Sequence, residues 1–89
     1  MHDDVVVLRQ SEFADAGSAG FGVAYIRDRD RTPQVGLAIV DFATKAEDTV
    51  AVRPGESFGV AGEVWQLAEV RNPAQRDWEV VLRRVRAAR

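Results

Sequence analysis

Short runs of alternating apolar and polar residues, each ended by a turn signal, recur along the chain at intervals of about ten residues. Alternation with a period of two is typical of β-strands, because successive side chains of a strand point to opposite faces. Residues 21–26 give the clearest example. We expect Phe21, Val23 and Tyr25 to share one face of this strand, with small residues on the other. The pattern predicts a mainly β protein.

The same reading places six strands before residue 71. They are Asp4 to Arg9, Phe21 to Ile26, Val35 to Phe42, Thr49 to Arg53, Ser57 to Val60 and Val64 to Val70. The segments 10–20, 27–33 and 43–48 are rich in small, charged or turn-forming residues and are expected to be connections. With six or seven short strands, the chain is expected to form a small antiparallel sandwich or a partly open barrel.

Two details inside these strands add to the prediction. Residues 35–42 are apolar on both faces, which indicates a central strand or one that is covered on both sides. In residues 64–70, Trp65 and Leu67 are in phase and Val70 is out of phase. A slip of one residue predicts a β-bulge near Ala68 or Glu69.

The last segment is compatible with two structures. As a strand, Trp78, Val80 and Leu82 alternate with their neighbours. As a helix from about residue 73 to 87, Asn72 would be the N-cap and Pro73 the first helical residue. The valines and the strand-rich context favour the strand, and an α+β fold with a C-terminal helix is the alternative.

Length and composition exclude several classes of protein. The 89 residues fit one domain, 1–89, and the absence of cysteine excludes disulfides and thiolate metal sites. The chain starts with an acidic segment, and the apolar run Val5 to Leu8 is too short for a secretory signal or a membrane span. We therefore expect a cytoplasmic protein with no membrane partner.

One segment matches a catalytic motif. Gly55 to Gly59 has the G-x-S-x-G pattern of serine hydrolases, which requires a nearby histidine base and a helix after the serine. The one histidine of the sequence is His2, and Gly62 interrupts the segment where the helix would begin. His2, Asp3 and Asp4 are too few ligands for a metal site at a chain terminus. We expect no enzyme activity, no catalytic residue, no metal and no cofactor.

Three short motifs lie within residues 52–85: Pro54 to Phe58, Ala61 to Trp65, and Trp78 to Leu82. In them the chain resembles small uncharacterised actinobacterial proteins with the pattern PGE/D-x-F, GG-x-x-W and W-x-V-x-L. The shared residues are turn formers and aromatic residues. The resemblance therefore implies a β fold and no particular activity.

The function we favour is a non-catalytic protein-interaction or accessory module that associates with itself as a homodimer or with a protein partner. A small open β domain has edge strands, which either pair with another chain or must be protected. The segments Val5 to Leu8 and Ser57 to Val60 are the expected edges.

Two other functions remain open. In the first, Tyr25, Trp65 and Trp78 line a pocket for a small molecule, in the mouth of a barrel or between two sheets. In the second, Arg83, Arg84 and Arg86 bind nucleic acid weakly through phosphates. Residues 71–89 carry a net charge of +4, but the whole chain carries −2, which makes nucleic acid the least favoured partner.

Overall fold

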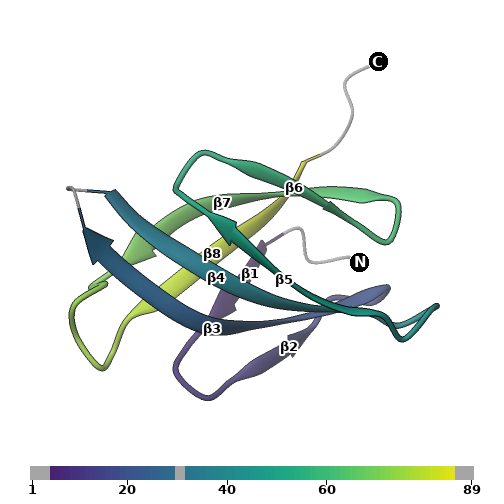
Figure 1. Cartoon of the computed structure of the whole chain (residues 1–89), viewed down its shortest axis with the longest axis horizontal. Helices are drawn as coiled ribbons and strands as arrows, with labels where there is room; N and C mark the ends of the chain where they lie inside the picture. Colours follow the sequence, from purple (N-terminus) through teal and green to yellow (C-terminus); the bar gives the residue numbers. More distant parts are fainter. Residues whose placement is uncertain (1–4, 30–31, 86–89) are drawn as a thin grey trace.

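The computed structural model describes residues 5–29 and 32–85, and within them the chain forms eight β-strands and no helix. This confirms the mainly β class. The strands are β1 (Val5–Leu8), β2 (Phe13–Asp15), β3 (Ala19–Arg29), β4 (Thr32–Asp41), β5 (Glu47–Val52), β6 (Ser57–Val60), β7 (Glu63–Arg71) and β8 (Glu79–Val85) (Figure 1).

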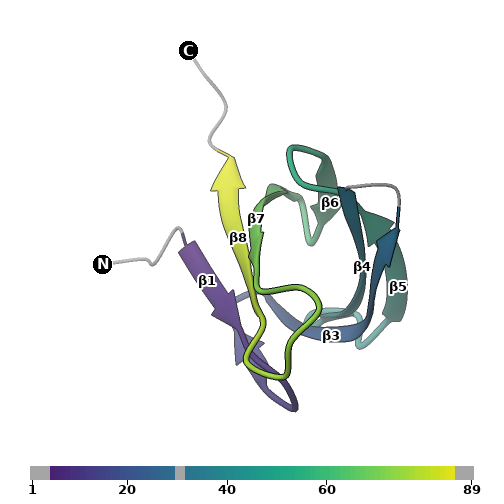
Figure 2. The same cartoon turned by 90° about the vertical axis from the view of Figure 1, so that its left-hand side faces the viewer.

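The strands form two four-stranded antiparallel sheets. Sheet A has the order β1-β8-β7-β6 and sheet B the order β2-β3-β4-β5. All paired strands are neighbours along the chain except β1 and β8, which join the two ends of the described chain. The sheets face each other with the core between them (Figure 2). Of the two architectures expected from the sequence, the structure is the sandwich.

The core consists of inward-facing side chains from both sheets. Phe21 of β3 contacts Trp65 of β7 and Phe58 of β6, with ring centroids 5.0 and 6.1 Å apart. Each large apolar side chain that is fully buried stabilises the fold by about 1.5–3 kcal/mol. The largest fully buried side chains are Leu8, Phe21, Val35, Leu37, Trp65, Leu67, Val80 and Leu82.

Tight turns lie at both ends of β6. At Pro54-Gly55 the amide of Glu56 donates to the carbonyl of Arg53 at 2.9 Å, and Gly55 has a φ of 93°, as a type II turn requires. At Ala61-Gly62, φ is 54° and 77°, which is the geometry of a type I′ hairpin turn between β6 and β7. The expected bulge is confirmed by a register shift between Leu67 and Glu69.

The strand prediction for the last segment is confirmed, and the helix from about 73 to 87 is not formed in the described part of the segment. β8 is hydrogen-bonded to β7 on one side and to β1 on the other. Val80 and Leu82 are fully buried on its inner face. A helix would satisfy its own backbone but would leave β1 without a partner and β7 paired only with β6, so tertiary pairing overrides the local helix signal.

Two segments expected to be connections contain strands. Residues 10–20 include β2, in which Phe13 pairs with Gly22, and the start of β3. The charged segment 27–33 extends the β3–β4 hairpin, with Asp28 opposite Pro33. Pro33 is tolerated because β5 pairs with β4 only from Val35 onward, so no further strand needs its missing N–H. The result is eight strands instead of six or seven.

A bulge that the sequence did not indicate lies in β3. The register with β4 shifts between Val23 and Tyr25, so that Val23 pairs with Leu37 and Tyr25 pairs with Gly36. The expectation that Tyr25 shares a face with Phe21 is therefore wrong. The extra residue, Ala24, turns the Tyr25 side chain to the outer face of sheet B and returns Ile26 to the inner face.

Candidate interaction surface

Of the three aromatic residues expected to line one ligand pocket, Tyr25 and Trp78 line the same groove and Trp65 does not. Trp65 is fully buried and belongs to the core. The guanidinium of Arg84 lies 4.9 Å from the centre of its ring. The indole nitrogen is buried and has no hydrogen-bond partner among the described residues. A ligand could reach Trp65 only if the core opened.

Tyr25 lies on the outer face of sheet B. Its ring occupies the space that a Cβ atom of Gly36 would take on the neighbouring strand. The guanidinium of Arg27, two residues further along β3, lies 5.0 Å from the centre of the Tyr25 ring. The bulge at Ala24 explains why the side chains of Tyr25 and Arg27 lie on this outer face.

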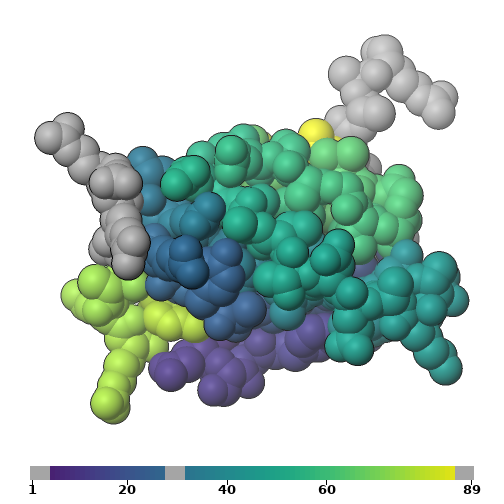
Figure 3. Space-filling model, in the orientation of Figure 1, coloured from purple at the N-terminus to yellow at the C-terminus, as the bar shows by residue number. Residues whose placement is uncertain are grey.

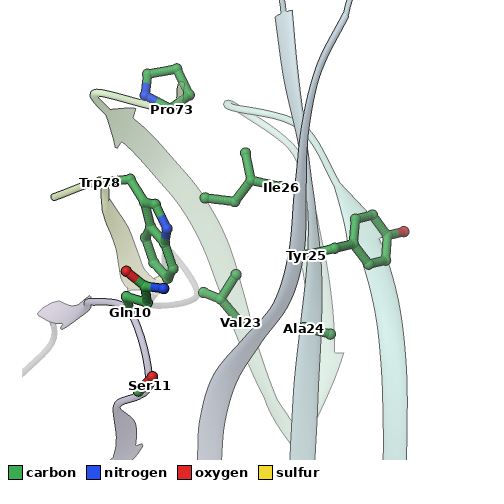
Figure 4. A pocket seen from close by; sticks show the side chains of 8 residues that line it. All are labelled: Gln10, Ser11, Val23, Ala24, Tyr25, Ile26, Pro73 and Trp78. Atoms are coloured by element: carbon green, nitrogen blue, oxygen red, sulfur yellow. The ribbon is translucent and has the colours of Figure 1, made fainter. Parts of the chain in front are cut away.

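Trp78 is half-buried and lines a groove of about 410 Å³ at one end of the sandwich. Across the groove it faces Val23 and Ile26 of β3, while the Tyr25 ring points away to the other side of that strand (Figure 4). Gln10 and Ser11 supply an amide and a hydroxyl, and Pro73 completes the wall. Among the described residues, the lining carries no charged side chain, so the groove suits an uncharged ligand.

The arginines expected to bind phosphates point in different directions. The side chain of Arg84 is only 16% exposed; its Nε lies 3.4 Å from Oε2 of Glu63, whose other oxygen accepts a hydrogen bond from Ser18. Arg83 is exposed and donates to Oε1 of Gln66 at 2.8 Å. Adjacent residues of a strand face opposite ways, which explains the separation. Arg86 lies outside the described residues.

The hydrolase-like motif forms a turn followed by a strand. Ser57 begins β6 directly after the Pro54-Gly55 turn, and no helix follows it anywhere in residues 57–85. His2, the one histidine of the sequence, and the neighbouring Asp3 and Asp4 lie outside the described residues. Residues 5–29 and 32–85 contain no group of three or more side chains suited to hold a metal ion.

The outer face of sheet B carries an exposed apolar surface. Phe13 of β2 is 55% exposed and Phe42, directly after β4, is 39% exposed. Both rings lie over Gly20 of β3, where a Cβ atom would overlap Phe13 and would come within 2.9 Å of Phe42. We call this surface the aromatic face. It consists of Phe13, Tyr25, Ala38, Val40, Phe42 and Ala51.

The aromatic face explains why residues 35–42 are apolar on both sides. β4 is central in sheet B, as expected, and its inner residues Leu37 and Ile39 are buried in the core. Its outer residues Ala38 and Val40 are only half-buried. No described part of the chain covers the outer face as a further layer, so the pattern reflects a central strand with one side uncovered.

Opposite charges mark the two ends of the aromatic face. At one end, Asp15 and Glu47 lie in register with Gly20 and Val40, on the two outer strands of the sheet. At the other end are Arg27 and, directly after β5, the exposed Arg53. Lys45 lies in the turn beyond the acidic end. The face is therefore acidic at one end, apolar in the middle and basic at the other.

The outer face of sheet A is different, because ion pairs occupy much of it. Glu79 of β8 binds Arg9 at 2.8 Å and Arg71 at 3.2 Å, and Arg71 also binds Glu69 at 2.9 Å. The hydrogen bond from Arg71 holds the pKa of Glu79 below its ordinary value, and the charge of Arg9 adds to this effect. The exposed Val64 and Val85 are cross-strand partners at the opposite end of β7 and β8 from these ion pairs.

Phe13 and Phe42 were not among the residues singled out from the sequence. Phe13 was assigned to a connection, and Phe42 to a strand that is either central or covered on both sides. The signal that the sequence offers is the cluster Gly17, Gly20 and Gly22, because glycine in a strand often marks the close approach of another group. The structure shows that aromatic rings from neighbouring segments lie on two of these glycines.

These features define a small two-sheet β domain with one uncovered aromatic face. The chain belongs to a family of unknown function, DUF6406, and the match covers residues 3–86. Comparison with curated proteins and with solved structures gave no match. In the part of the chain that the structure describes, there is no helix long and apolar enough to cross a membrane.

Proposed function

We propose that the protein is a non-catalytic interaction module that binds a protein surface through the aromatic face. The observation that carries this proposal is the exposure of Phe13 and Phe42, whose rings lie side by side over Gly20. Aromatic side chains are enriched in the centres of protein interfaces. Burying such surface contributes about 25 cal/mol for each Å² removed from water.

The arrangement of the face supports binding of a protein rather than a small molecule. Figure 3 views the molecule from this side, with β3, β4 and β5 turned to the viewer. The rings of Phe13, Tyr25 and Phe42 lie on glycines of the neighbouring strands. A broad surface with exposed aromatic side chains suits another broad surface, whereas a small ligand requires a concave site.

The test compares two substitutions at equally exposed positions. Phe42 and Val85 are both 39% exposed, and they lie on the outer faces of different sheets. We expect Phe42→Ser to abolish capture of a specific protein by the tagged chain, and Val85→Ser to retain it. Circular dichroism should show that both variants are folded. Equal capture by the wild type and both variants would contradict the proposal.

The groove beside Trp78 supports a second candidate function, binding of an uncharged small molecule. Its volume of about 410 Å³ lies within the usual range for ligand sites. Trp78 reports on this groove by fluorescence, because Trp65 is shielded in the core. A panel of uncharged aromatic metabolites should include one that quenches wild-type fluorescence and has no effect on Trp78→Phe. If no compound quenches the wild type, this candidate is excluded.

The observations give less support to the other expectations from the sequence. Nucleic-acid binding loses support, because Arg84 is engaged with Glu63 and Trp65 inside the sandwich. A cytoplasmic location, the absence of enzyme activity and the relation to actinobacterial proteins stay predictions from the sequence. A cytoplasmic location is consistent with the absence of cysteine from the chain.

A further inference from the structure

We propose that the partner of the aromatic face is a second copy of this chain, which packs face to face with its strands antiparallel to those of the first. This inference rests on the proposed function and names the partner for it. The argument comes from the distribution of charge around the face.

The first step is the position of the charges. Glu47 and Arg53 lie at opposite ends of the same edge strand, six residues apart, so about 20 Å of strand separates them. Asp15 and Arg27 lie near the same two ends on the other side of the sheet. The charge on the face therefore changes sign along the strands and keeps the same sign across them.

The second step is the symmetry of a homodimer. Two identical faces pack through a two-fold axis that lies in the plane of the interface. If that axis runs along the strands, acidic ends meet acidic ends. If it runs across the strands, Glu47 of each copy meets Arg53 of the other, and Asp15 of each copy lies near Arg27 of the other. Only the second arrangement places opposite charges together, and it also places the apolar centres in contact.

The third step is the size of the face. Four strands about 4.8 Å apart, three of them about 20 Å long and β2 shorter, give roughly 400 Å² for each copy, below the total of about 1,200–2,000 Å² of stable specific interfaces. We therefore expect a weak dimer that forms at high protein concentration. Its rim consists of exposed ion pairs, so its affinity should fall as salt is added.

The experiment uses charge reversal in the full-length protein. Glu47→Arg and Arg53→Glu each place two like-charge contacts in the dimer, and each should weaken self-association at least about tenfold. An equimolar mixture of the two variants should restore association, because every contact in the mixed dimer again joins an acid to a base. Arg76→Glu makes the same charge change as Arg53→Glu, but in the exposed β7–β8 loop. It should leave association unchanged.

Sedimentation equilibrium over a wide concentration range gives the dimerisation constant for each sample. A concentration-dependent dimer of the wild type, lost in both single variants and recovered in their mixture, supports the proposal. A wild type that stays monomeric at every concentration would overturn it, as would single variants that associate as well as the wild type. If the wild type is monomeric but still captures a protein in a Phe42-dependent manner, the homodimer is excluded and the proposed function stands.

Discussion

The ring of Tyr25 on β3 occupies the position that a side chain of Gly36 would take on β4, and the two residues are direct cross-strand partners. A bare backbone beside an aromatic ring lets the ring lie flat on the sheet. The same arrangement recurs where Phe13 covers Gly20 and Gly22. The outer face of sheet B is thus built from pairs of an aromatic residue and a glycine.

This relationship predicts the effect of adding one methyl group. Gly36→Ala should destabilise the protein by about 1–3 kcal/mol, because the new Cβ atom overlaps the Tyr25 ring. In a Tyr25→Ala background, the same substitution should cost little, since the space is free. Urea denaturation of the four proteins of this double-mutant cycle measures the coupling. Equal cost in both backgrounds would show that the ring does not occupy this position.

The type I′ turn between β6 and β7 predicts a stabilising substitution. Ala61 has a φ of 54°, which is unfavourable for alanine and acceptable for asparagine and glycine. Ala61→Asn should raise the free energy of unfolding by about 0.5–1 kcal/mol. Ala61→Gly should stabilise less, because glycine has more freedom in the unfolded chain. Ala51→Gly, in an extended strand, is the matched control and should destabilise.

The two tryptophans should differ in their access to solvent. Trp65 is fully buried and Trp78 is half-buried beside the groove. Acrylamide should therefore quench the emission of wild-type protein only in part. Trp78→Phe should remove the quenchable part, and Trp65→Phe should leave it. Strong quenching of the Trp78→Phe variant would mean that the core is open to solvent.

The ion pairs of Glu79 predict a dependence of stability on pH. Arg71 and Arg9 hold the pKa of Glu79 below its ordinary value near 4.5. A group whose pKa is lowered by folding stabilises the protein above its unfolded pKa, and this stabilisation is lost as pH falls through the folded pKa. The difference in melting temperature between wild type and Glu79→Gln should be largest near neutral pH and vanish in acid. A difference in melting temperature that does not change with pH would show that the stabilisation does not come from the charge of Glu79.

Arg84 should contribute more to stability than its neighbour Arg83. Its side chain lies on the Trp65 ring and beside Glu63. Arg84→Ala should cost about 1–3 kcal/mol, because it uncovers the ring and leaves Glu63 without this partner. Arg83→Ala loses an exposed hydrogen bond to Gln66 and should cost less than about 1 kcal/mol. Thermal melts of both variants test whether Arg84→Ala destabilises the protein more than Arg83→Ala.

Features that depend on neighbouring residues in the chain were predictable from the sequence. They include every strand except β2, the Pro54-Gly55 turn and the bulge near Ala68, because alternation and turn chemistry act over a few residues. The positions of β1 and β6 at the edges of sheet A were also predicted correctly. Both segments are only four residues long, and short strands are common at sheet edges.

Features that depend on pairing between distant segments were decided by the tertiary structure. β2 exists because Phe13 finds Gly22 on β3, and Tyr25 faces outward because β3 bulges where it pairs with β4. The helix signal after Asn72 is overridden because β8 lies between two strands. Alternation also shows that a strand has two apolar faces without showing which face is covered. Cross-strand pairing settles this, and it leaves the aromatic face on the outside.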